Sequence, residues 1–112
     1  MTISWAFLRN SWNTCGKTRE FLGLHDVQIE TELNARNERI EAETAWELFT
    51  DAEMIYVING RKINEWLPTA ENKEDILAKA IGRSGNLRAP TIKVNHVFVV
   101  GFNEEVYSQL LL

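Results

Sequence analysis

The chain has 112 residues, of which 45% are hydrophobic and 25% charged, a composition typical of one ordinary globular domain. Its net charge of −4 argues against direct nucleic-acid binding, because neutralising phosphates requires a basic face. The single cysteine excludes an internal disulfide, and Met1 to Trp5 lacks the features of a secretory signal. No apolar run approaches the roughly 20 residues of a membrane span. We therefore expect a cytoplasmic protein with no membrane partner.

The first third of the chain predicts a β-α-β unit. Ile3 to Leu8 is an apolar run typical of a strand buried on both faces. A helix is expected from about Thr14 to Leu24, with Asn13 or Thr14 as its N-cap. Val27 to Leu33 alternates apolar and polar residues and predicts a second strand. Two strands joined by a helix in this way should be parallel neighbours.

The middle of the chain predicts a helix and a hairpin. After a polar loop over residues 34–39, one helical face is apolar: Ala42, Ala45, Trp46, Leu48 and Phe49. Met54 to Ile58 and Lys62 to Trp66 flank Asn59-Gly60, a pair that favours a type I′ hairpin turn. A short apolar run can also be helical, so a helix remains an alternative to the hairpin.

The last third predicts a helix, a second hairpin and a final helix. Asn72 is a candidate cap for a helix that Gly82 closes. Pro90 precedes a strand over residues 91–94, and residues 97–100 return antiparallel after a turn. Asn103 is placed to cap the last helix. The predicted order is β-α-β, a helical and hairpin insertion, then β-β-α, in a single α/β domain spanning residues 1–112.

Cys15, the only thiol, lies where the first strand gives way to the first helix. Free N–H groups and the dipole at a helix start favour a thiolate, so the position predicts a lowered pKa. Lys17 and Arg19 lie within about one helical turn and are candidates to lower the pKa of this thiol further. Solvated helix-surface residues are the alternative for both, and the favoured one for Lys17. A buried, inert cysteine is the alternative, since free cysteines are often packing residues.

Three segments resemble one known family. Cys15 to Leu22 (Cys-Gly-Lys-Thr-Arg-Glu-Phe-Leu) resembles the active-site helix of the arsenate reductase (ArsC) and Spx group. Leu87 to Thr91 (Leu-Arg-Ala-Pro-Thr) is similar to the segment around its cis-proline, and Val99 to Tyr107 to its ending. The resemblance implies a thioredoxin-like fold. Gly85 to Thr91 is similar also to a branch of small ArsC-like proteins, some of which carry selenocysteine in a U-x-x-C loop.

The attacking residue of that loop falls on Trp12 when Cys15 is taken as the second thiol. Positions i and i+3 of a helix share a face, and the turn after Leu8 then has the short length that such turns prefer. The other register places the attacking group at Cys15 itself; we favour the first. Trp12 is then either an ordinary loop aromatic or the replacement of a selenocysteine, whose codon UGA some codes read as tryptophan.

The resemblance implies a thiol- or selenol-dependent oxidoreductase acting on a small or protein disulfide, with Cys15, Trp12 and Arg19 as catalytic positions. Pro90, Ala89 and Thr91 would face the substrate, and Arg88 and Arg61 are candidates to hold an oxyanion. Glutathione, glutaredoxin or thioredoxin would supply electrons; we expect no bound cofactor or metal, and a monomer. The alternative is a non-enzymatic regulator that, like Spx, binds RNA polymerase. A third alternative, arsenate reduction, is disfavoured because Ala89 replaces a further arginine of that pattern.

Overall fold

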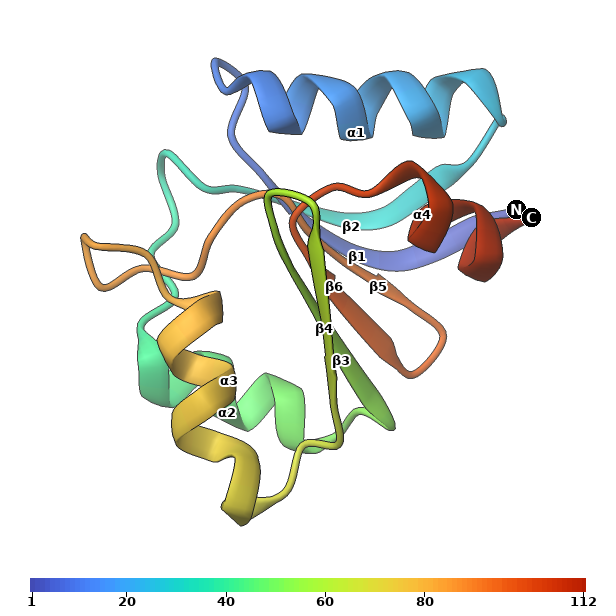
Figure 1. The fold of residues 1–112 in the computed structure, drawn as a ribbon. Helices are drawn as coiled ribbons and strands as arrows, with labels where there is room; N and C mark the ends of the chain where they lie inside the picture. Colours follow the sequence, from blue (N-terminus) through green and yellow to red (C-terminus); the bar gives the residue numbers. More distant parts are fainter.

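In the computed structural model, which describes residues 1–112, six strands form one mixed sheet in the order β2-β1-β5-β6-β3-β4 (Figure 1). The strands are β1 (Thr2–Leu8), β2 (Gln28–Asn34), β3 (Met54–Asn59), β4 (Lys62–Trp66), β5 (Thr91–Val94) and β6 (Val97–Val100). The helices are α1 (Asn13–Leu24), α2 (Ala42–Thr50), α3 (Lys73–Ala80) and α4 (Glu104–Leu111), with a short 3-10 turn at Ala70–Asn72. The α/β class predicted from the sequence is confirmed.

The predicted β-α-β unit is present. Strands β1 and β2 run parallel, with Ile3 opposite Ile29 and Phe7 opposite Leu33. Helix α1 connects them, but its N-cap is Trp12, in an extended conformation, and no side chain caps the helix. The predicted cap at Asn13 or Thr14 is therefore wrong: the helix begins earlier, and both residues already belong to it.

The predicted hairpin is also present, but its turn is of a different type. Asn59 lies opposite Lys62, so Gly60 and Arg61 form the two-residue loop. Only Gly60 has a positive φ, of 60°, and this is the pattern of a type II′ turn rather than the expected type I′. Strand β3 also pairs parallel with β6, so the inserted hairpin extends the main sheet.

The hairpin of β5 and β6 joins the two halves of the sheet. Strand β5 is antiparallel to both β1 and β6, and Asn95 takes a positive φ of 57° in the connecting turn. This central position explains why Ile92 and Val99 are completely buried. The sheet is thus continuous from the edge strand β2 to the edge strand β4.

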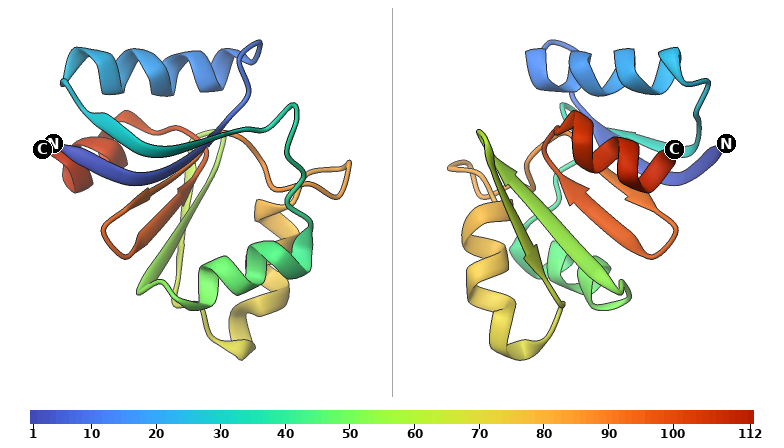
Figure 2. Two further views of the ribbon diagram at one scale, coloured as in Figure 1. Left: turned by 180° about the vertical axis from the view of Figure 1, so that it is seen from behind. Right: turned by 45° about the vertical axis from the view of Figure 1, so that its right-hand side comes forward.

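Helices cover both faces of the sheet. Figures 1 and 2 show α1 and α4 on one face and α2 and α3 on the other, with the chain termini close together. The side chain of Asn103 accepts a hydrogen bond from the Val106 amide, which confirms the predicted cap of α4. Asn72 precedes α3, but its side chain donates instead to the carbonyl of Leu67. None of the helices has the length and apolar character needed to cross a bilayer.

Candidate functional site

The candidate site lies at the carboxyl ends of β1 and β2. Parallel neighbours end at the same edge of a sheet, where the loops that follow them commonly form a binding crevice. Here those loops and the segment before β5 surround a cavity of about 310 Å³, which we call the central hollow. It is lined by Arg9, Trp12, Ala35, Gly82, Arg83, Ser84, Asn86, Leu87, Arg88 and Ala89.

Trp12 forms one wall of the central hollow and remains 43% exposed. The guanidinium carbon of Arg9 lies 4.7 Å from the centre of the Trp12 ring, a cation–π distance. The Arg9 Nε is buried and has no hydrogen-bond partner. The hollow therefore contains an aromatic face and a cation with an unused donor.

Cys15 lies one turn of α1 further on and is completely buried. Burial raises the pKa of its thiol, because the apolar surroundings disfavour the charged form. The Arg9 amide, which donates to Sγ over 3.3 Å, and the charges of Arg19 and Arg9 lower the pKa without offsetting burial. The expectation of a lowered pKa is wrong: proximity to the helix start was predicted correctly, but the burial of the sulfur outweighs it.

A buried hydrogen-bond chain fixes α1 beside this site. Thr18 Oγ1 donates to Tyr107 Oη over 3.0 Å, and Tyr107 Oη donates to the Gly101 carbonyl over 3.0 Å. Burial, the largest effect, raises the pKa of Tyr107 far above its ordinary value, so its hydroxyl stays protonated. Reading the sequence did not identify these partners, because Thr18 and Tyr107 are 89 positions apart.

The segment before β5 contains a cis peptide bond between Ala89 and Pro90, as the resemblance implies. Ala89 lines the central hollow beside Trp12. Pro90 is buried, and its carbonyl accepts a hydrogen bond from the Gly101 amide over 2.7 Å. Thr91 is also buried, and its hydroxyl donates to the Arg88 carbonyl over 2.7 Å. Of these expected substrate-facing residues, only Ala89 lines the hollow.

The arginines predicted for the site have different surroundings. Arg88 is half-buried, and its terminal nitrogens donate to the carbonyls of Lys79 and Ile58 over 3.0 and 2.9 Å. Burial lowers the pKa of Arg88, and its nitrogens stabilise backbone carbonyls instead of standing free for an oxyanion.

Arg19 lies on the flank of α1. It forms an ion pair with Glu32 over 2.7 Å and donates to the Asn10 side chain over 2.9 Å. Arg61 is exposed in the turn between β3 and β4 and does not line the central hollow. The structure therefore brings Trp12, Ala89 and Arg88 together around one cavity, with Cys15 buried beneath, and leaves Arg61 outside.

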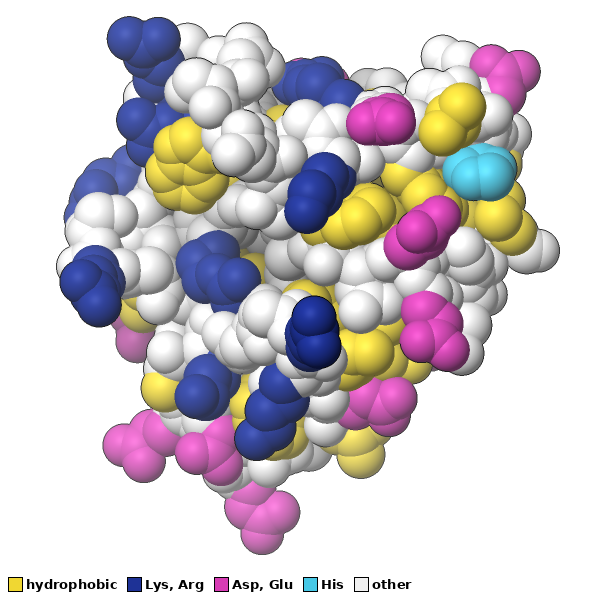
Figure 3. Space-filling model, turned by 45° about the horizontal axis from the view of Figure 1, so that its top comes forward, with side chains coloured by type: hydrophobic (Ala, Val, Ile, Leu, Met, Phe, Trp, Pro, Cys, Tyr) yellow, Lys and Arg dark blue, Asp and Glu magenta, His cyan; other side chains and the backbone are white.

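Two further hollows adjoin the central one. The outer hollow, of about 310 Å³, is lined by Asn10, Ser11, Asn34, Arg36 and Asn37. The inner hollow, of about 230 Å³, is lined by Thr14, Lys17, Ile58, Gly60, Arg88, Gly101 and Phe102. No Asp or Glu lines any of the three hollows, although the chain contains 16 such residues. Figure 3 shows Lys and Arg side chains across the left and centre of one face, with Asp and Glu mainly in its right half and along its lower part.

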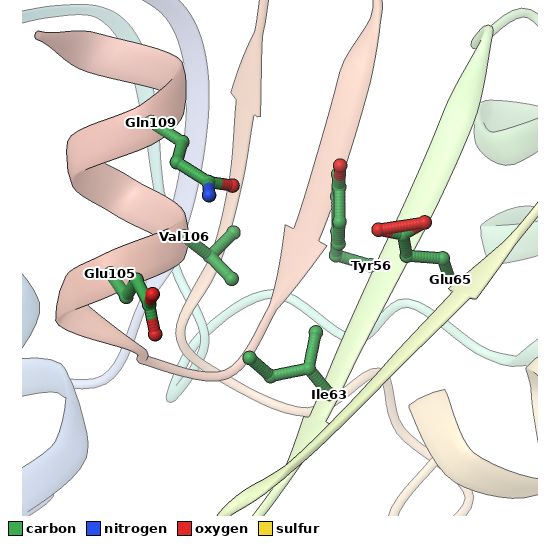
Figure 4. A pocket seen from close by; sticks show the side chains of 6 residues that line it. All are labelled: Tyr56, Ile63, Glu65, Glu105, Val106 and Gln109. Carbon is green, nitrogen blue, oxygen red and sulfur yellow. The ribbon is translucent and has the colours of Figure 1, made fainter.

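A separate cavity of about 460 Å³ has the opposite character, and we call it the acidic hollow. Its lining residues are Tyr56, Ile63, Glu65, Glu105, Val106 and Gln109, from β3, β4 and α4 (Figure 4). Burial first, then the nearby charge of Glu65 and its hydrogen bond, raises the pKa of Tyr56. No cluster of three or more His, Cys, Asp or Glu side chains is placed to hold a metal ion.

No protein-family model matches the sequence, and no curated protein matches it. The family assignment therefore remains a prediction that rests on the residues quoted above.

Proposed function

We propose that this chain is a thiol- or selenol-dependent oxidoreductase of the thioredoxin-fold ArsC/Spx-like group, in which position 12 is the attacking position and Cys15 the resolving thiol. One observation carries the proposal: position 12 is the N-cap of α1 and lines a cavity with Ala89, whereas Cys15 is buried one turn later. An attacking group must reach its substrate, and the favourable electrostatics of a helix start act on an exposed residue there.

The topology supports the same proposal. The β-α-β unit and the final β-β-α unit, which the resemblance treats as the core, pack as one continuous stretch, β2-β1-β5-β6. The inserted hairpin adds to the far side of β6 and leaves the edge around position 12 open. The loop before α1 and the segment before β5 line the same cavity, and this supports a substrate site at position 12.

The proposed reaction begins with a thiolate or selenolate at position 12. It attacks one sulfur of a substrate disulfide, forms a mixed bond and releases the other sulfur as a thiolate. That thiolate takes the proton of Cys15, whose sulfur then attacks residue 12 and releases the second substrate sulfur as a thiolate. The product is a bond between positions 12 and 15. Two thiols from glutathione, or the dithiol of a glutaredoxin or thioredoxin, reduce this bond and restore the starting state.

Trp12 supplies no sulfur or selenium, so the chain as printed lacks the attacking atom of this reaction. We propose that position 12 is natively selenocysteine, encoded by UGA. A UGG codon at this position in the source gene would eliminate this part of the proposal. The proposed location is the cytoplasm, which keeps thiols reduced. The proposed substrate is a small or protein disulfide, and the proposed oligomeric state is a monomer. Arsenate is not the proposed substrate, because Ala89 replaces the further arginine of the arsenate reductase pattern.

The test compares Trp12→Cys with Ser11→Cys, which places a thiol in the same exposed loop one residue out of register. We expect Trp12→Cys to reduce insulin or a small aromatic disulfide with glutathione or a thioredoxin system, and to lose turnover when combined with Cys15→Ala. The printed chain and Ser11→Cys should show no turnover above background. Equal rates for Trp12→Cys and Ser11→Cys would refute the assignment of position 12.

A second candidate, a non-enzymatic regulator like Spx, is favoured by a different observation. The only thiol of the printed chain is completely buried and has a raised pKa, which does not suit repeated exchange. This candidate predicts a stoichiometric complex with RNA polymerase when the printed chain is used as bait. It also predicts that Trp12→Cys binds polymerase but does not reduce disulfides.

A further inference from the structure

Three hollows lie near one another at this end of the sheet, and we call their combined lining the arginine groove. The central and inner hollows share Arg88, while the outer and central hollows meet where Arg9 is followed by Asn10 and Ala35 by Arg36. Five of the 12 Lys and Arg residues line the groove: Arg9, Lys17, Arg36, Arg83 and Arg88. A chain with net charge −4 thus concentrates positive charge at one site.

None of the five cations of the groove belongs to an ion pair within the chain, although Lys17 also lines a neighbouring cavity with Glu20 and Glu104. The three ion pairs are Arg19–Glu32, Arg39–Glu41 and Lys73–Glu43, and none includes a residue that lines the groove. Arg36 and Arg83 are exposed, and Arg9 keeps a buried Nε without a hydrogen-bond partner. Cations gathered on one surface without ion-pair partners create a local positive potential, which attracts an anionic ligand.

One wall of the groove is held in place without a ligand. The amide of Leu87 donates to the Ile40 carbonyl over 2.7 Å, and the side chain of Asn86 accepts from the Ile40 amide. Arg39 donates to the carbonyl of Ser84. The loop that carries Arg83 is therefore attached to the segment between β2 and α2, and the spacing of the cations is preorganised, which lowers the entropic cost of binding.

We propose that the arginine groove binds an extended acidic segment of a protein partner, with Glu or Asp side chains on Arg36, Arg83 and Arg9 as the segment passes over Trp12. A small anion would need only the central hollow, whereas the acid-free lining continues through all three. The net charge of −4 repels a nucleic acid at long range, while a short acidic segment contacts only the basic face. If the proposed exchange also occurs, acidic segments flank its substrate disulfides; binding itself does not require residue 12 to react.

The test uses the printed chain and fluorescence anisotropy of a labelled twelve-residue peptide of alternating Glu and Ser. We expect saturable binding that weakens as salt rises, and no binding of the matching Lys and Ser peptide. Arg36→Gln and Arg83→Gln should each weaken binding roughly two- to fivefold, as expected for exposed charge pairs. Lys62→Gln, an equal charge change at an exposed residue of β4 outside the groove, is the matched control and should leave binding unchanged.

Several outcomes would overturn the proposal. An equal loss from Lys62→Gln would mean attraction by net charge alone, and absence of Glu peptide binding at low salt would exclude the ligand class. Displacement of the peptide by millimolar inorganic phosphate at constant ionic strength would indicate a small-anion site. Tighter binding of a twelve-residue oligothymidylate would indicate nucleic acid. Because the experiment uses the printed chain, its failure leaves the Trp12→Cys exchange assay unaffected, and the reverse also holds.

Discussion

The arginine groove and the acidic hollow are both lined by residues of the stretch that leads from β6 into α4, but they differ in charge and in the hydrogen bonds that support them. Gly101 lines the groove, whereas Glu105 and Val106 line the acidic hollow. The groove is bounded by loops fixed to one another through backbone and buried hydrogen bonds. The acidic hollow lies between α4 and the β3–β4 hairpin, and most of its lining side chains are exposed. The difference indicates that buried hydrogen bonds are concentrated at the edge of the sheet where position 12 lies.

The largest effect is expected from Gly101→Ala, which disturbs the support of the groove. Gly101 has φ of 101°, and an added Cβ would lie 2.9 Å from the Cβ and 3.1 Å from the carbonyl oxygen of Ile58. Backbone strain and overpacking together should lower the free energy of unfolding by roughly 2–4 kcal/mol, measured by urea denaturation. Gly16→Ala is the control: nothing lies within 4 Å of its added Cβ in α1, and it should stabilise by about 0.5–1 kcal/mol. A loss of similar size in both variants would contradict the account of Gly101.

The second comparison uses Tyr107, which hydrogen-bonds to the groove residue Gly101, and Tyr56, which lines the acidic hollow. Tyr107→Phe removes the hydroxyl between Thr18 and the Gly101 carbonyl and leaves both buried groups without that partner. We expect a loss of about 1–3 kcal/mol in the free energy of unfolding. Tyr56→Phe, in the acidic hollow, should change stability by no more than about 0.5 kcal/mol. Equal effects of the two substitutions in thermal and urea unfolding would show that the buried hydrogen-bond chain is not a distinguishing feature.

The smallest expected effect is a change in the pH dependence of the free energy of unfolding. Burial raises the pKa of Cys15 above its ordinary value of 9.0, so the folded protein keeps its proton at a pH where the unfolded chain loses it. This stabilisation is complete below about pH 9 and is lost as pH rises from there toward the folded pKa. The slope from this one thiol is at most about 1.4 kcal/mol per pH unit. Comparing the pH dependence of unfolding with that of Cys15→Ala isolates it; identical slopes would contradict a raised pKa.

The sequence was sufficient to predict the helices and strands, but it was insufficient to predict most of the contacts within the site. The spacing of apolar residues predicted the strands and helices, because the buried face of a strand or helix repeats at a fixed interval along the sequence. It failed at the hairpin turn, where Gly60 and Arg61, rather than Asn59 and Gly60, occupy the loop. It also failed for the pKa of Cys15, because position along a helix does not reveal how deeply a side chain is buried.

Several residues of the site were not predicted from the sequence, and all were missed for the same reason. Arg9 lies in the turn after β1, where its amide donates to Cys15 and its guanidinium stacks on Trp12. Arg36 follows β2 and Arg83 precedes β5, and the pairing of β1 with both of these strands brings their segments to the end of β1. The net charge of −4 gave no indication of this groove, because an overall count averages over the surface and conceals a local excess of cations. A prediction of the groove required the order of the strands.

The two outermost strands have a consequence for the behaviour of the protein in solution. Strand β2 presents Glu30 and Glu32 as exposed residues, and β4 presents Lys62 and Glu65. An unpaired strand edge is a template on which another chain can add, and charged side chains along it oppose such addition. Both edges of this six-stranded sheet therefore carry charges that oppose edge-to-edge aggregation.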